Sequence, residues 1–260
     1  MIGETINAPY AEKFTVSNVF SSDMVVQRGE HIRVWGFADA SENGHKVSGE
    51  FMGMFAEARI ENGAWTLTFG ARLNACAEQG NSMRIYTDKT AFVFENVLVG
   101  DVFMVIGQSN VAYSMAAHRA AVPEAERGGV GYDVPSTPIR LHYNSLMQET
   151  GVTRGTEEVC AELRNRETWK RADAAAVQDF SALGYLFATE YARATGVPVG
   201  VIEIDGNGQP IGAFLPNSVA EATGSDKWSE QKGYYVTFGC NGDAARYMYN
   251  HYMYPFEKYA

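Results

Sequence analysis

Cysteine is scarce in this sequence of 260 residues. Only Cys76, Cys160 and Cys240 are present. They are far apart, odd in number and form no Cys-x-x-Cys pair, so we expect no structural zinc site. Free thiols are the expectation, with a single disulfide as the open alternative.

Positive charge is also scarce. Lys and Arg number 21 against 31 Asp and Glu, which gives a net charge of −10. The densest basic stretch, residues 164–171, is typical of a solvated surface. A protein that binds nucleic acid needs clustered cations, so we expect no nucleic-acid partner.

The chain lacks the patterns of membranes and cofactors. No apolar run approaches the roughly 18 residues of a membrane span, and residues 1–10 contain no apolar core of a signal peptide. We therefore expect no membrane partner and, by default, a cytoplasmic location. The glycine cluster at 128–131 follows no strand and lacks the Lys-Ser/Thr of a phosphate loop. No metal, nucleotide or organic cofactor is expected.

Residues 1–98 predict a β-sandwich domain. Segments 31–35 and 64–69 alternate apolar and polar side chains, as half-buried strands do. Asn62-Gly63 stands between two such runs and is a strong hairpin signal, because both residues tolerate positive φ. Short strands with evenly spaced turns suit a sandwich.

Residues 99–260 predict an α/β domain with a parallel sheet. The apolar runs at 102–106 and 199–204 are typical of strands buried on both faces, and 138–143 is a weaker strand candidate. Residues 121–178 otherwise predict long surface loops with little regular structure.

Residues 179–195 predict a helix between two of these strands. Asp179 is the expected N-cap and Gly196 the expected stop. Strand, helix and strand in this order imply a right-handed parallel crossover. The expected apolar face consists of Phe180, Leu183, Gly184, Phe187 and Tyr191.

A serine follows the first apolar run of this domain directly. Ser109 lies where we expect the chain to pass from strand to a helix that ends near Arg119. The carboxyl edge of a parallel sheet is where ligands bind, and the free N–H groups of a helix N-terminus suit an oxyanion. Position 111 is Val, so Gly-x-Ser-x-Gly is not matched. A nucleophile and a simple helix cap both stay open from these residues alone.

Short segments along the chain share a further pattern. They are VFSSDMVVQR (19–28), IRVWG (32–36), NGAW (62–65), LVGDV (98–102), GQSN (107–110), FSALGYLFA (180–188), GVPVGVI (196–202) and MYN (248–250) with Pro255. In this order they resemble the sialate O-acetylesterase family of SGNH-type serine hydrolases. The resemblance implies a β-sandwich followed by an SGNH-like three-layer α/β domain whose C-terminal part is missing here.

The resemblance also implies the site. Ser109 matches the family nucleophile, and its backbone N–H matches one oxyanion donor. In the segment DGNGQPI (205–211), Gly208 matches a glycine that resembles a second donor, although a simple turn glycine is the alternative. Asn207 stands where a glycine is usual and could donate through its side chain. The flanking residues expected at the oxyanion and substrate are Gly107, Gln108 and Asn110.

The general base is the missing part of this pattern. The family keeps it in a late Asp-x-x-His motif, which this sequence lacks. His118 would lie about 13 Å along a helix from Ser109, out of reach. We expect structural or surface roles for the remaining histidines, which are His31, His45, His142 and His251. The Asp and His are therefore expected beyond residue 260, and this chain alone is expected to be inactive; we do not expect a partner chain to supply the base.

The expected function is hydrolysis of O-acetyl esters of sialic acid by a serine nucleophile. An esterase of acetylated plant polysaccharide is one alternative. A non-catalytic carbohydrate-binding protein is the other, because the base is missing. The partner in each case is a small sugar or glycan. Members of the family often act outside the cytosol, so the compartment stays open.

Overall fold

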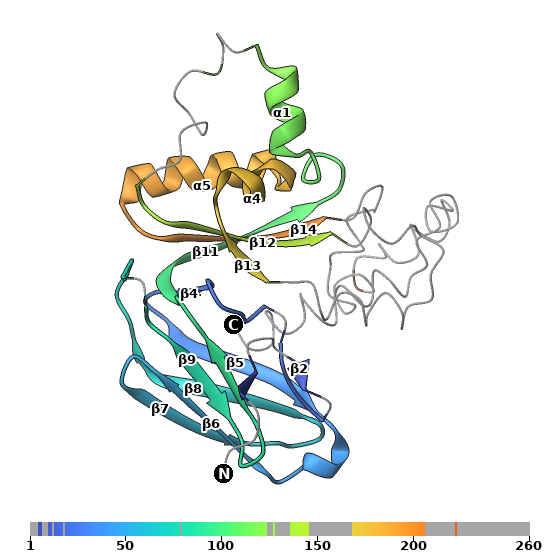
Figure 1. The fold of residues 1–260 in the computed structure, drawn as a ribbon, viewed down its shortest axis with the longest axis vertical. Helices are drawn as coiled ribbons and strands as arrows, with labels where there is room; N and C mark the ends of the chain where they lie inside the picture. The colour runs from blue at the N-terminus through green and yellow to red at the C-terminus, as the bar shows by residue number, and fades with distance from the viewer. Residues whose placement is uncertain are drawn as a thin grey trace, which may run out of the picture.

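The structure is a computed structural model that describes residues 5–6, 10–11, 13–17, 19–78, 80–123, 127, 136–145, 168–205 and 222. Within them the protein is a mixed α/β structure in which strands predominate. A two-sheet sandwich lies on one side and a mainly parallel sheet with its helices on the other (Figure 1).

Two sheets in the N-terminal part enclose one apolar core. The first has the order β1 (Thr5–Ile6), β10 (Ala91–Phe94), β9 (Met83–Tyr86), β6 (Lys46–Phe51) and β7 (Met54–Arg59). The second has the order β2 (Tyr10–Ala11), β3 (Phe14–Val16), β5 (His31–Ala38) and β8 (Ala64–Arg72). The alternation predicted at 31–35 and 64–69 is confirmed, because Val34 and Leu67 are fully buried while Arg33 and Thr68 are exposed.

The Asn-Gly turn forms, but it does not join neighbouring strands of one sheet. Asn62 and Gly63 have φ of 53° and 75°, and Glu61 and Ala64 exchange backbone hydrogen bonds across the turn. Beyond that single bridge the strands diverge, since β7 pairs with β6 and β8 pairs with β5. The turn therefore carries the chain from one sheet of the sandwich to the other.

A third sheet has the order β13, β12, β14, β11 and β4. Its strands are β13 (Trp169–Arg171), β12 (Ile139–Ser145), β14 (Val199–Asp205), β11 (Leu98–Gly107) and β4 (Val25–Gln27). β14 pairs in parallel with both β12 and β11, and β13 is antiparallel to β12. The predicted parallel strands are therefore confirmed.

The helices α1 (Met115–Ala121), α4 (Ala174–Asp179) and α5 (Ala182–Thr195) lie on one side of this sheet, and the sandwich lies on the other (Figure 1). Successive side chains of a strand point to opposite faces. Accordingly Val199 and Val201 of β14 pack with the helices, whereas Ile202 and Ile204 belong to the core of the sandwich.

The start of the long helix differs from the prediction. Asp179 ends α4, and Ser181 is the N-cap of α5, where its hydroxyl accepts a hydrogen bond from the Gly184 N–H. The two helices are separate because Phe180 has an extended backbone and is buried. The predicted stop is confirmed, since Gly196 has φ of 68°.

The predicted apolar face of α5 is also partly wrong. Leu183 is 58% exposed and Phe187 is 47% exposed. Gly184 is buried as predicted, because the helix lies so close to the sheet there that an added Cβ would stand 3.0 Å from Val105. Small residues make this close contact possible. The buried side of α5 consists of Ala182, Gly184, Tyr185, Ala188, Thr189 and Ala192.

β11 is less enclosed than its sequence predicts. Residues 102–106 are half-buried, whereas every residue of β14 is buried. β4 pairs with β11 only up to Gly100, and among the described strands only β14 pairs with it from Asp101 onward. One edge of this part of β11 therefore has no strand partner among the residues that the structure describes, although the Val102 N–H donates to Oε1 of Gln27 at 2.8 Å.

The segment expected to form long loops contains three regular elements in its described part. β12 confirms the strand candidate at 138–143, whereas β13 and most of α4 also fall within residues 121–178, so the prediction of loops is too broad. The predicted division between residues 98 and 99 falls inside β11. The division into two domains stays a prediction.

Candidate active site

Ser109 lies on a tight turn immediately after β11. The carbonyl of Gln108 accepts hydrogen bonds from the N–H groups of Val111 (2.8 Å) and Ala112 (2.9 Å), which close the turn. Gln108, Ser109 and Asn110 are exposed. Because the turn follows the carboxyl end of a strand in the parallel part of the sheet, Ser109 is accessible at the edge where ligands bind in such folds.

Ser109 does not begin a helix, contrary to the prediction. α1 begins at Met115, and its N-cap Ser114 accepts a hydrogen bond from the Ala117 N–H at 3.2 Å. Ser114 is available as the cap because the backbone on either side of it is bound to another segment, as described below. The helix is short and starts six residues after Ser109, so its N-terminus does not supply the oxyanion donors expected beside Ser109.

Gly107 has a steric role in this turn. A Cβ at position 107 would stand 2.8 Å from the Cγ2 of Val111, whose side chain is buried. Real Cβ atoms do not approach so closely, so a larger residue would displace either the turn or Val111. The glycine therefore lets the chain fold back directly at the end of β11.

Two carboxyl groups on β14 lie close to this edge. Asp205 pairs in register with Gly107, and Glu203 lies two residues further inside the sheet. Both residues are buried. Burial raises the pKa of Glu203 to about 8; the Ser181 N–H, which donates to it, opposes the shift, and the charge of Asp205 adds to it.

Sequence reasoning did not single out these two acids. The signal was present, because Glu and Asp interrupt a run otherwise composed of apolar residues in a strand expected to be buried. Acidic residues are almost never fully buried without a partner. Their position in the run therefore marks them as candidates for a specific role.

The predicted oxyanion residues Asn207 and Gly208 lie outside the described residues. β14 ends at Asp205, next to the end of β11. The roles of Asn207 and Gly208 stay a prediction.

The histidines are spread over the described structure. His142 is fully buried, with its ring 5.3 Å from that of Trp169. His31 contacts the carbonyl of Phe69 at 3.2 Å, and His45 contacts Glu42 at 3.0 Å. His118 lies in α1. His251 lies outside the described residues.

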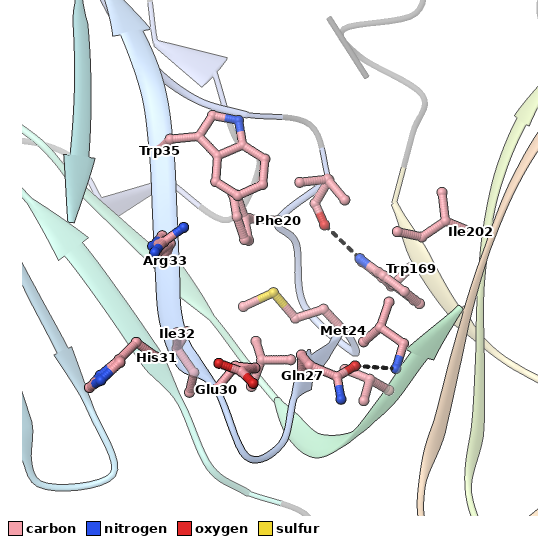
Figure 2. Close-up of a pocket in the computed structure, with 14 residues that line it drawn as sticks. Phe20, Met24, Gln27, Glu30, His31, Ile32, Arg33, Trp35, Trp169 and Ile202 are labelled. Atoms are coloured by element: carbon pink, nitrogen blue, oxygen red, sulfur yellow. Dashed lines mark hydrogen bonds between the residues drawn. The ribbon is translucent and has the colours of Figure 1, made fainter. Parts of the chain in front are cut away.

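A cavity of about 160 Å³ lies between the sandwich and the parallel sheet (Figure 2). Its walls are mainly apolar and include Phe20, Met24, Trp35 and Ile202. The indole N–H of Trp169 donates to a backbone carbonyl of the sandwich, at 2.6 Å, and so joins the two parts beside the cavity. None of residues 107–110 lines it, so this cavity is separate from the Ser109 turn.

Other features of the described residues bear on the remaining predictions. No group of three or more His, Cys, Asp or Glu in them could hold a metal ion. None of the helices in this part of the chain is long and apolar enough to cross a membrane. Cys76 is a free thiol, and Cys160 and Cys240 lie outside the described residues.

Comparison with known proteins shows a likeness to solved structures. No family model and no curated protein matches the sequence. Among solved structures, the chain resembles a carbohydrate acetylesterase from Xanthomonas citri with a TM-score of 0.57 and 24% sequence identity. The match covers 79% of this chain and 43% of that esterase. The two proteins share a fold over this region, and the chain spans less than half the length of that relative.

Proposed function

We propose that this chain is the nucleophile-bearing part of a carbohydrate O-acetylesterase. The observation that carries the proposal is the exposed Ser109 on a tight turn at the carboxyl end of β11. The turn belongs to a fold shared with a carbohydrate acetylesterase. We further propose that the α/β part is the SGNH type and that residues 1–98 form a separate β domain.

In the proposed reaction the Oγ of Ser109 attacks the carbonyl carbon of an acetyl ester. A general base takes the hydroxyl proton and returns it to the leaving sugar oxygen, which leaves acetyl bound to Ser109. Water then attacks this ester and releases acetate. The backbone N–H of Ser109, with Asn207 or Gly208, is the proposed oxyanion donor set, flanked by Gly107, Gln108 and Asn110. No described residue is assigned as the base.

The proposed substrate is an O-acetylated sialic acid, and acetylated plant polysaccharide is the alternative with the same chemistry. A second candidate function is carbohydrate binding without catalysis. The observation that favours it is the absence of an Asp-x-x-His motif from the sequence.

The test measures the chemical reactivity of Ser109 together with acetate release. The intact chain is incubated with a fluorophosphonate probe and, separately, with 9-O-acetylated sialic acid and acetylated xylan. Imidazole is added in parallel, because a small base can replace a general base that is not in place. Ser109→Ala is compared with Ser41→Ala, which removes an exposed serine of the sandwich.

We expect the probe to modify Ser109 when imidazole is present. We expect imidazole also to produce acetate release that Ser109→Ala abolishes and Ser41→Ala preserves. Acetate release without imidazole would support the esterase and contradict the expected lack of a base in this chain. An unmodified Ser109, with no rescue on either substrate, would refute the esterase. Sugar binding in that case would favour the binding protein.

A further inference from the structure

Glu203 occupies an unusual position for a carboxyl group. It lies on β14, the central strand of the parallel sheet, and its exposed fraction is 0%. Because Ile202 and Ile204 belong to the core of the sandwich, Glu203 points toward the helices. Its register neighbours are Val105 on β11 and Tyr143 on β12.

One oxygen of this carboxyl group holds the start of α5. The Ser181 N–H donates to Oε2 of Glu203 at 2.7 Å. No described residue hydrogen-bonds to Oε1. A buried polar atom without a hydrogen bond lowers the free energy of unfolding. The acid at this position therefore reduces the stability of the protein.

The segment held by Glu203 is joined to the chain that follows Ser109. The Met115 N–H donates to the Phe180 carbonyl at 2.9 Å, and the Ala182 N–H donates to the Tyr113 carbonyl at 2.8 Å. These two bonds form an antiparallel bridge between Ser114 and Ser181. Ser114 is also the N-cap of α1. The bridge therefore fixes the far end of the turn that begins at Gly107.

We propose that Glu203 is a positioning residue for Ser109. Its carboxyl group fixes the position of the Ser181 backbone. The two hydrogen bonds between residues 113–115 and 180–182 then hold the end of the turn that follows Ser109. One end of the turn is then fixed by β11 and the other by β14 through Glu203. An effect of Glu203 on catalysis by Ser109 rests on the proposed function. The fixing of the turn by Glu203 does not.

The neighbouring charges give this contact a pH dependence. On this face, the titratable groups of the described elements packed against β14 are Asp205 on the same strand, Tyr143 on β12 and Tyr185 on α5; Asp101 and Tyr191 lie toward the opposite end of the strands. None of these is a cation that could compensate a buried carboxylate. With its pKa raised to about 8, Glu203 is neutral at pH 7 and ionises at mildly alkaline pH. The carboxylate accepts the Ser181 N–H more strongly than the neutral group does, but it is buried away from water, so ionisation favours any opening that exposes it.

The experiment is amide hydrogen exchange of the full chain at pH 7 and pH 9, expressed as protection factors. The amides followed are those of Met115, Ser181 and Ala182. The variants are Glu203→Gln, which keeps a carbonyl acceptor without a charge, and Glu203→Leu, which removes the acceptor. Glu190→Gln is the matched control, since Glu190 is an exposed acid of α5. Phosphonylation of Ser109 is timed in the same samples.

In the wild type and in Glu190→Gln we expect protection to fall by about tenfold from pH 7 to pH 9, because ionisation of the buried Glu203 in this interval favours the open state by that factor. In Glu203→Gln the three amides should stay protected at both pH 7 and pH 9. In Glu203→Leu they should lack this protection at both pH values. Phosphonylation should be about tenfold slower in Glu203→Leu than in Glu203→Gln at pH 7. Equal protection in Glu203→Leu and the wild type at pH 7 overturns the proposal. If the wild-type Ser109 does not react, the proposed function fails while the exchange data still decide the positioning role.

Discussion

Replacing Glu203 with Gln should make the protein more stable, and increasingly so as the pH rises. An ordinary Glu ionises near pH 4.5, whereas burial raises the pKa of Glu203 in the folded protein to about 8. Between these values the folded state binds a proton that the unfolded state has released. The contribution of Glu203 to stability is therefore complete below about pH 4.5 and is lost as the pH rises to about 8.

Each pH unit in that interval amounts to about 1.4 kcal/mol of unfolding free energy, and the whole interval to about 5 kcal/mol. This is an upper figure, because local opening admits water to the carboxylate. Gln preserves the acceptor for the Ser181 N–H and does not titrate. The stability difference between Glu203→Gln and the wild type should thus grow from pH 5 to pH 8 and level off above.

The assay is urea unfolding of both proteins at pH 5, 6, 7, 8 and 9, followed by circular dichroism. Because the remaining charges are the same, their pH effects cancel in the difference. Glu190→Gln serves as the control and should show no such slope, since its side chain is half-exposed. A difference that does not change with pH would mean that Glu203 ionises normally, and the reasoning about its burial would be refuted.

Two further substitutions test contacts that lie away from the Ser109 turn. Gly36→Ala should lower the unfolding free energy by about 3 kcal/mol, because the added Cβ would stand 2.0 Å from a backbone oxygen of β3; urea melts with an unchanged midpoint would contradict this contact. Asp101→Asn should lower the unfolding free energy at pH 7, because Arg28 loses its two-point carboxylate partner. Arg28 also lowers the pKa of Asp101, so the wild-type advantage should shrink as the pH falls from the ordinary value through the lowered pKa; an advantage that stays constant down to acid unfolding would contradict the pairing.

The strands of this protein were predictable because their signals are local. Alternation gave β5 and β8, and unbroken apolar runs gave β11 and β14. The side of α5 that faces the sheet was not predictable in the same way. Large apolar residues dominate a sequence pattern, but close packing on a sheet selected small ones, and Leu183 and Phe187 remain exposed.

The Ser109 turn shows a related difference. The sequence placed the serine correctly after β11, since a strand end and a glycine are local features. It could not place the start of α1, because Ser114 becomes a cap only through backbone bonds to Phe180 and Ala182. Those residues are more than 60 positions away in the chain. Glu203 differs in that the sequence did mark it, as an acid within an apolar run; only its contact with Ser181, which comes from another element, could not be predicted.

The continuity of β11 sets a limit on how this molecule can move. Val99 of this strand exchanges backbone hydrogen bonds with Cys76 and belongs to the core of the sandwich, and Asp101–Gly107 pair with β14 before the chain reaches Ser109. A continuous strand offers no hinge. The hydrogen bond from the Trp169 indole to the Val19 carbonyl is a second connection between the parallel sheet and the sandwich. The sandwich and the serine-bearing edge should therefore tumble as one rigid body. A substrate that touches both would meet a preformed surface, and its fit would be decided by side chains and loops rather than by domain closure.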